Sequence, residues 1–166
     1  RELVALAGQL GVERAIGLGG MPAVVSHRQP VPILATATDS ALAKEAGAIR
    51  GDYHGVTGLQ TVLQVALGEA GIPSLGLWAQ VPHYVSATPS PPAVRALLER
   101  LRDLAGISLD LSSLDPQVQD YTARVEEGLA DRPDVAELVT AIEEQERGEV
   151  SGDEIAAEIE QFLRDQ

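Results

Sequence analysis

The sequence has no cysteine and very few aromatic residues. Its 166 residues include one tryptophan, one phenylalanine and three tyrosines. Without cysteine the chain forms no disulfide framework and no thiolate metal or redox site, which fits a reducing compartment, and we expect a cytoplasmic protein. Because aromatic residues make up only 3% of the chain, it also lacks the base-stacking surface that binds single-stranded nucleic acid.

Long hydrophobic runs are absent as well. No run approaches the ~20 apolar residues that a membrane-spanning helix requires, so we expect no membrane partner. The hydrophobic fraction of 45% and the charged fraction of 22% are ordinary for a globular protein. A chain of this length fits one domain, or one domain with a small appendage.

Basic side chains are scarce, and the charge is unevenly distributed. The chain has 12 basic and 25 acidic side chains, a net charge of −13. Residues 1–90 hold five basic and six acidic side chains, whereas residues 91–166 hold seven and nineteen. The second part would repel a phosphate backbone, so we expect no nucleic-acid partner. A solvated surface that keeps the protein soluble explains its acidity better than a dedicated basic partner does.

The first 90 residues have the pattern of an α/β fold. Three continuous apolar runs predict buried strands, which favours parallel pairing: Arg14–Leu18, Val31–Thr38 and Ser74–Val81. Helical spacing and caps predict helices at Arg1–Leu10, at Ser40–Ala46 behind the cap Asp39, and from the capping box Thr57–Gln60 to the residue before Gly71. The last of these carries an apolar stripe for packing, formed by Leu59, Val62, Leu63, Ala66 and Leu67.

Beyond Pro91-Pro92 only helices are predicted. Their starts are marked by Pro92, by the cap Asp115 before Pro116, by Pro133, and by the capping box Ser151–Glu154. We therefore divide the chain into residues 1–90, the C-terminal part of an α/β domain, and residues 91–166, an acidic helical extension. Three strands make a narrow sheet with an exposed edge. We expect further strands upstream in a longer protein, or else a partner chain that covers the edge.

Several motifs in order resemble one known family. They are Leu77–Val85 (Leu-Trp-Ala-Gln-Val-Pro-His-Tyr-Val), Pro89–Ala93, Gly17–Gly20, His27-Arg28 before Pro30-Val31, and Tyr53–Gly58, where Val56 replaces an expected proline. Together they resemble the bacterial branch of the proteasome assembly chaperone 2 family over nearly the whole chain. The resemblance implies a three-layer α/β/α fold of the phosphorylase/hydrolase-like type with a mixed sheet. Eukaryotic and archaeal relatives are linked to proteasome assembly, while the bacterial branch has no settled activity to carry over.

Backbone N–H groups at two places are candidates for binding an anion. The first is a turn expected at Gly17–Gly20, with Gly19 and Gly20 as ligand contacts; Pro22 stands where a dinucleotide fingerprint needs its third glycine. The second is the helix start at Thr57 and Gly58. A tight turn and ordinary helix capping explain the same residues, and we favour these structural explanations.

Side chains in two loops complete the candidate ligand site. His27 and Arg28 form a concentrated pair of donors that suits an anion, although an ion pair with a neighbouring acid or subunit explains them better. Trp78, His83 and Tyr84 lie where open α/β sheets bind ligands. The structural alternatives are core positions for the two aromatic residues and a buried, satisfied histidine. Three separated histidines are not spaced as metal ligands, so we expect no metal and no cofactor.

Three hypotheses for function follow. The leading one is a non-enzymatic binding or assembly module that presents a preformed surface to a protein partner. It would act as a homo-oligomer, with a trimer among the arrangements open to it. The competing one is a binding protein or hydrolase/phosphorylase-like enzyme for a phosphate- or nucleoside-like ligand, with Arg28 as anion clamp and His27 or His83 as acid–base. The third hypothesis is a protein that keeps this fold but retains no catalytic activity.

Overall fold

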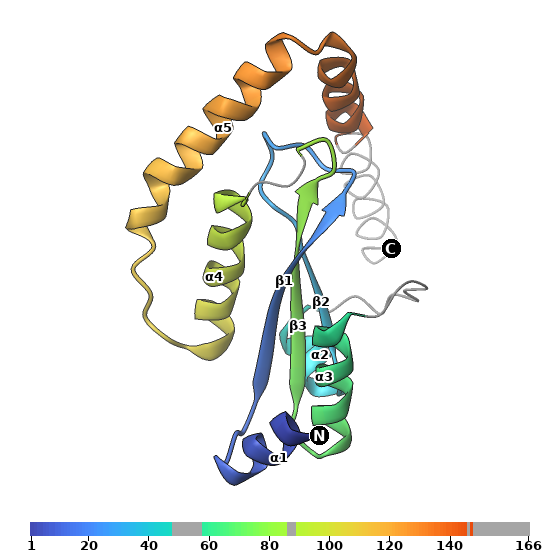
Figure 1. Cartoon of the computed structure of the whole chain (residues 1–166), viewed down its shortest axis with the longest axis vertical. Coiled ribbons are helices and arrows are strands. Elements are labelled where there is room, and N and C mark those ends of the chain that lie inside the picture. Colours follow the sequence, from blue (N-terminus) through green and yellow to red (C-terminus); the bar gives the residue numbers. More distant parts are fainter. Residues whose placement is uncertain (48–57, 86–88, 146, 148–166) are drawn as a thin grey trace, which may run out of the picture.

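The computed structural model of the chain describes residues 1–47, 58–85, 89–145 and 147 as an α/β fold (Figure 1). Its elements in chain order are α1 (Glu2–Gln9), β1 (Ala15–Ala23), β2 (Ile33–Ala37), α2 (Ser40–Glu45), α3 (Leu59–Glu69), β3 (Ser74–Pro82), α4 (Pro91–Ala105), the short 3₁₀ helix η1 (Ser112–Leu114) and α5 (Asp115–Ala130). Residues 133–145 form a further helix. The predicted order of strands and helices is confirmed over these residues.

The sheet of the described residues has three strands in the order β1-β3-β2 and is mixed. β1 pairs parallel with the central β3, with Gly17 opposite Gly76. β2 pairs antiparallel with β3, with Ala35 opposite Leu77, so parallel pairing is wrong for β2. Residues 24–32 contain no helix, and they are too few for the crossover of about a dozen or more residues that a parallel connection needs.

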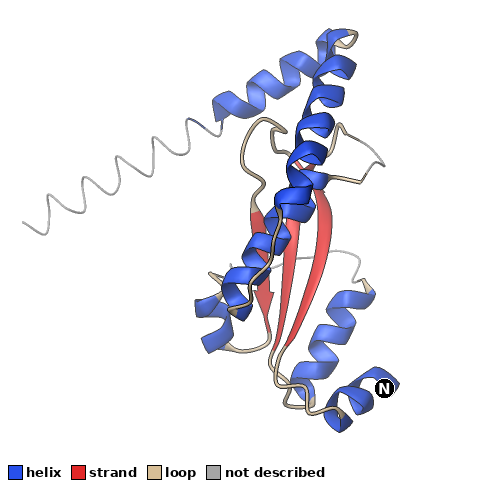
Figure 2. Cartoon of the chain, turned by 90° about the vertical axis from the view of Figure 1, so that its left-hand side faces the viewer, coloured by secondary structure: helices blue, strands red, loops and turns tan. Residues whose placement is uncertain are grey.

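Helices cover both faces of this sheet. On one face Leu75, Leu77 and Ala79 of β3 are buried in a core that α2 and α4 complete with Leu42, Ala46, Ala93 and Leu97. On the other face α3 lies over β1 and β3. Figure 2 shows the strands between these helices, with α4 in front. Because alternate residues of β3 face opposite layers, its continuous apolar sequence is buried from both sides.

Gly17–Gly20 lies inside β1 and not in a turn, so that prediction is wrong. These residues pair in register with Gly76–Ala79 of β3. A Cβ atom on Gly17 would lie 2.7 Å from Nε2 of Gln60, and one on Gly19 would lie 2.7 Å from the indole carbons of Trp78. The glycines of β1 thus make room for two large side chains on the α3 face. Their N–H groups belong to the sheet and do not form an anion-binding turn.

The start and the packed side of α3 also differ from the prediction. The N-cap of the helix is Gly58, without a side-chain hydrogen bond; Thr57, the first residue of the predicted capping box, lies outside the described residues. Leu59 and Val62 are exposed, whereas Gln64 is buried. The glycines of the strands beneath α3 leave room for long amide side chains, and this turns part of the apolar stripe outward.

Beyond β3 the only regular elements among the described residues are helices, as predicted. Ser90 caps α4 through its side chain, but Asp115 is the first residue of α5 and not its cap. α5 and the helix at 133–145 pack on each other through Leu129, Val135 and Val139, and we call residues 115–145 the helical arm. The predicted helix start at Ser151–Glu154 lies outside the described residues. None of the described helices combines the length and the apolarity needed to cross a membrane.

Candidate functional site

The structure divides the predicted site residues between two places. Trp78 and Gly58 line a cavity on the α3 face, with Gly19 directly beneath Trp78. The second group, His27, Arg28, His83 and Tyr84, gathers beyond the ends of β1 and β3. Gly20 belongs to neither, because its Cβ position faces Val81 on the opposite side of the sheet. The prediction that one hollow collects all these residues is therefore wrong.

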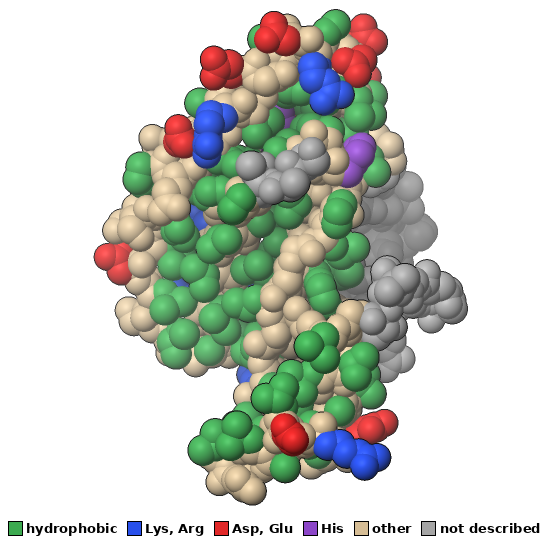
Figure 3. Space-filling view, viewed as in Figure 1, with side chains coloured by type: hydrophobic (Ala, Val, Ile, Leu, Met, Phe, Trp, Pro, Cys, Tyr) green, Lys and Arg blue, Asp and Glu red, His purple; other side chains and the backbone are tan. Residues whose placement is uncertain are grey.

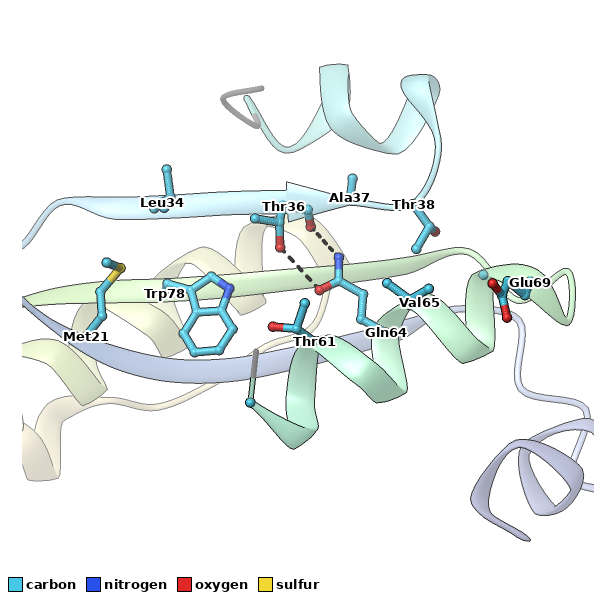
Figure 4. Close-up of a pocket in the computed structure, with 12 residues that line it drawn as sticks. Met21, Leu34, Thr36, Ala37, Thr38, Thr61, Gln64, Val65, Glu69 and Trp78 are labelled. Carbon is cyan, nitrogen blue, oxygen red and sulfur yellow. Dashed lines mark hydrogen bonds between the residues drawn. The ribbon is translucent and has the colours of Figure 1, made fainter. Parts of the chain in front are cut away.

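The α3-side cavity has a volume of about 740 Å³ and lies between β2 and α3 (Figure 4). Apolar groups line most of it, including Met21, Leu34, Val65 and Trp78. Across the cavity Gln64 is fixed by two hydrogen bonds to Thr36, one from its Nε2 to the carbonyl oxygen at 3.0 Å and one from the threonine hydroxyl to its Oε1 at 3.2 Å. Its described lining contains no lysine, arginine or histidine. The lining of the cavity therefore suits an apolar ligand better than a phosphate.

Parallel pairing brings the second group together. Ala23 lies opposite Pro82 at the ends of β1 and β3, so the loops that follow the two strands emerge side by side. Tyr84 then reaches the other loop, where its hydroxyl accepts the backbone N–H of His27 at 3.0 Å and lies 2.8 Å from Nδ1 of the same histidine. The strand ends thus position His27 without help from the helical arm.

Two carboxylates of the helical arm meet the donors of this loop. Arg28 binds both oxygens of Glu126, with Nε to Oε1 at 2.6 Å and Nη2 to Oε2 at 2.8 Å. His27 Nε2 lies 3.1 Å from the same Oε1. Ser26 donates its hydroxyl to Glu143 at 2.7 Å, and Arg28 Nη1 lies 3.8 Å from that carboxylate. We call Ser26, His27 and Arg28 the donor cluster.

The electrostatics of the cluster follow from these contacts. Hydrogen bonds from Arg28 lower the pKa of Glu126 to about 2, and the same bonds raise the pKa of Arg28. The His27 side chain is only 1% exposed. Because a carboxylate only accepts, Nε2 of His27 carries the hydrogen, and Nδ1 of a neutral ring accepts from Tyr84. Burial raises the pKa of Tyr84, so its hydroxyl stays protonated and able to donate.

His83 is exposed, so the prediction of a buried histidine is wrong. Its Nδ1 lies 3.1 Å from the carbonyl oxygen of Ala23, and its ring meets that of Tyr84 edge-on. The position beyond the last residue of β3 explains this, because the chain turns there toward solvent. His83 therefore ties the two strand ends together from outside, and it does not contact Glu126.

Sequence reasoning found the donors of this cluster and missed their partners. Ser26, Glu126 and Glu143 carry no motif, and the two glutamates are among nineteen acidic side chains of residues 91–166. The favoured explanation of Arg28, an ion pair with an acid, agrees with the structure, but the acid lies 98 positions away. The described residues hold no group of three or more histidine and acidic side chains placed for a metal ion. What the cluster does chemically is bind carboxylates.

Comparison with known proteins identifies the family. The model of the PAC2 family matches residues 1–129. The chain belongs to the PAC2 family. None of the curated proteins compared with it matches.

Solved structures of PAC2 family proteins share the fold. A PAC2 family protein from Streptomyces avermitilis is 40% identical, with 83% of this chain and 58% of that chain covered and a TM-score of 0.76. A proteasome-assembly chaperone homologue of Mycobacterium tuberculosis is 37% identical, with the same coverage and a TM-score of 0.74. An archaeal homologue of the proteasome-assembly chaperone from Pyrococcus furiosus, at 21% identity, coverages of 77% and 56% and a TM-score of 0.60, shows the fold alone. The chain spans less than two thirds of the length of each.

Proposed function

We propose that this PAC2 family chain is a protein-binding module of the assembly-chaperone type, which presents preformed surfaces and catalyses no reaction. The observation that carries the proposal is an exposed apolar surface on α3, where Leu59, Val62 and Val65 are 78%, 53% and 51% exposed. α1 contacts α3 and adds Leu3, Leu6 and Leu10, which are also exposed. We call these six residues the α1–α3 apolar surface. Exposed apolar side chains gathered on two helices in contact are typical of protein-interaction sites.

The charge distribution supports an interaction with another copy of the chain. α1 and α3 hold one acidic residue each, Glu2 and Glu69, and no basic residue. Figure 3 shows acidic side chains gathered along the arm, while apolar side chains spread over the middle and lower parts of the molecule, with a few charged ones at the lower end. Two copies of a protein with a net charge of −13 meet with least repulsion through surfaces that lack charge. A homo-oligomer, with a trimer among the arrangements open to it, is therefore part of the proposal.

The relatives indicate the kind of partner. The Mycobacterium tuberculosis relative is described as a proteasome-assembly chaperone homologue, and we propose proteasome subunits as the protein partner and the cytoplasm as the compartment. No observation favours the competing hypothesis of a phosphate- or nucleoside-binding enzyme. The donors proposed for it, His27 and Arg28, already bind carboxylates of the same chain.

Assembly of the Mycobacterium tuberculosis proteasome from separate α and β subunits tests the proposal, followed on native gels with and without the chain. We expect faster assembly with the chain, and loss of the effect in Val62→Glu, because a charge on the α1–α3 apolar surface prevents its burial. Ile107→Glu is the matched control, since Ile107 is exposed to a similar extent but lies in the loop after α4. Equal assembly rates with and without the chain would rule out the proposed partner.

Sedimentation velocity tests self-association separately. The wild-type chain is expected to sediment above its monomer mass of 17.5 kDa, and the Val62→Glu variant is expected to sediment at that mass. A wild-type monomer at the highest soluble concentration would contradict the homo-oligomer.

A further inference from the structure

The donor cluster presents only hydrogen-bond donors to the helical arm. Arg28 offers two N–H groups, His27 one and Ser26 its hydroxyl, and each of them meets an oxygen of Glu126 or Glu143. A guanidinium that donates two N–H groups, beside an imidazole and a hydroxyl, is an arrangement that recognises a carboxylate. The arm therefore fills a site whose chemistry is that of an anion-binding site.

The donor cluster is built by the α/β part of the chain and not by the arm. The backbone N–H of Arg28 donates to the Ser26 hydroxyl at 3.1 Å, which fixes the loop internally. Tyr84 holds both the backbone and the ring of His27. None of these hydrogen bonds involves a residue of the arm, so they do not depend on the carboxylates of Glu126 and Glu143. Such prior organisation lowers the cost of binding a ligand.

An open pocket and an unsatisfied hydroxyl lie where the arm meets the part that holds the cluster. A cavity of about 310 Å³ lies at this junction, lined by Tyr84 and Val85 on one side and by residues of the arm such as Tyr121, Val125 and Leu129 on the other. The Tyr121 hydroxyl is buried without a hydrogen-bond partner among the described residues. The unsatisfied hydroxyl weakens the docked arrangement. The small core of the arm also packs against Tyr84 and α5 contacts α4, so the arm is attached through these contacts together with the polar contacts of the donor cluster.

We propose that Ser26, His27 and Arg28 form a carboxylate-binding site that the chain's own Glu126 and Glu143 occupy, and that an acidic segment of a partner protein takes their place. The arm then acts as an internal competitor. Its tethered carboxylates have an effective concentration of about millimolar, so a partner binds only when it makes further contacts or when the arm is weakened. The inference rests on the proposed role in protein binding, but its test uses no proteasome subunit, so either can fail without the other.

The test measures binding of an acidic peptide to the full chain by fluorescence anisotropy. The probe is a fluorescein-labelled peptide with the sequence of residues 115–145, which carries both glutamates. The wild-type chain is expected to bind it weakly, and the double variant Glu126→Gln/Glu143→Gln at least tenfold more tightly, because its own arm no longer competes. Adding Arg28→Ala to the double variant should abolish the gain.

Two controls keep the result specific. The variant Glu127→Gln/Glu144→Gln removes the same charge at exposed neighbouring positions, and it should bind the probe as weakly as the wild type. A probe with glutamine at positions 126 and 143 should bind the double variant at least tenfold more weakly than the acidic probe. Circular dichroism and Trp78 fluorescence establish that the variants are folded.

Three outcomes would overturn the proposal. They are equal binding by both double variants, equal binding of both probes, and displacement of the acidic probe by inorganic phosphate but not by an unlabelled glutamate-rich peptide. The last outcome would assign the site to a phosphate ligand and not to an acidic protein segment.

Discussion

Arg28 and Glu126 form a bidentate ion pair although 98 positions separate them in the sequence. Arg28 lies in the loop after β1, and Glu126 lies in the last turns of α5. The pair therefore joins the first strand of the sheet to the helical arm. Replacing both residues at once tests their coupling. Each single replacement also predicts a distinct change in the free energy of unfolding.

Arg28→Ala should lower the free energy of unfolding by about 1–2 kcal/mol, because it leaves two carboxylates of the arm without their cation, with part of the effect screened by solvent. Arg28→Lys should recover less than half of the loss, since an ammonium cannot bind both oxygens in the same way. Urea denaturation followed by Trp78 fluorescence measures both.

Arg14→Ala is the matched control for this prediction. Arg14 also binds both oxygens of a glutamate, Glu45, at 3.0 and 3.1 Å and is exposed to a similar extent as Arg28, but its pair does not join the arm to the sheet. Its removal should cost less than about 0.5 kcal/mol. Equal losses for Arg14→Ala and Arg28→Ala would contradict a special role for the Arg28–Glu126 pair.

The ion pair also predicts a pH dependence of stability. The pKa of Glu126 falls from 4.5 to about 2 on folding, chiefly through hydrogen bonds from Arg28. A carboxyl whose pKa is lowered on folding stabilises the protein fully above its unfolded pKa, and the stabilisation is lost as the pH falls toward the folded pKa. Glu126→Gln should therefore cost roughly 1 kcal/mol near neutral pH, because the side chain is 40% exposed.

The difference between wild type and Glu126→Gln should shrink as the pH falls below 4.5. Denaturation at a series of pH values from neutral down to the acid limit of the folded protein measures it. Glu127→Gln, which removes the same charge at an exposed position one residue away, is the matched control. A constant difference for Glu126→Gln across the series would contradict the lowered pKa.

Local signals predicted the elements well where the partners are close in sequence. The carboxylate of Asp39 accepts the backbone N–H of Leu42 at 2.8 Å, and Gly47 has a positive φ of 59° after α2, as the cap and stop signals indicate. Such features depend on residues three or four positions apart. They were predictable because the chain segment itself contains both partners.

The misassigned features depend on residues that are far apart in sequence. Gly17–Gly20 has the composition of a turn, and only Gln60 and Trp78 above it show why a strand needs glycine there. Val62 fits an apolar stripe, but Gln64 takes the buried side because Thr36 of β2 binds its amide. Pairwise packing of this kind has no signature in a single sequence.

Replacing tyrosine by phenylalanine at positions 84 and 121 should change the free energy of unfolding in opposite directions. Tyr84→Phe removes the acceptor for the backbone N–H of His27 and should lower the free energy of unfolding by about 1–2 kcal/mol. Tyr121→Phe removes a buried hydroxyl that has no partner among the described residues, and it should raise that free energy by up to about 1 kcal/mol. Urea denaturation of the two variants, each the control of the other, measures the sign. A loss of stability in Tyr121→Phe would show that its hydroxyl does have a partner.

Glycines in neighbouring positions of β1 give the last prediction. A Cβ atom on Gly19 would lie 2.7 Å from Cε3 and Cζ3 of Trp78, too close for any contact between carbon atoms, whereas one on Gly20 would lie 3.7 Å from Cγ2 of Val81, an ordinary contact. Gly19→Ala should therefore lower the free energy of unfolding by about 1–3 kcal/mol through overpacking, and should shift the Trp78 emission because the indole moves.

Gly20→Ala, the matched control in the same strand, should be neutral or stabilising by up to about 1 kcal/mol, since alanine loses less backbone freedom on folding. Equal effects of the two substitutions would mean that the indole of Trp78 does not rest on Gly19, and the account of why this strand is rich in glycine would be wrong.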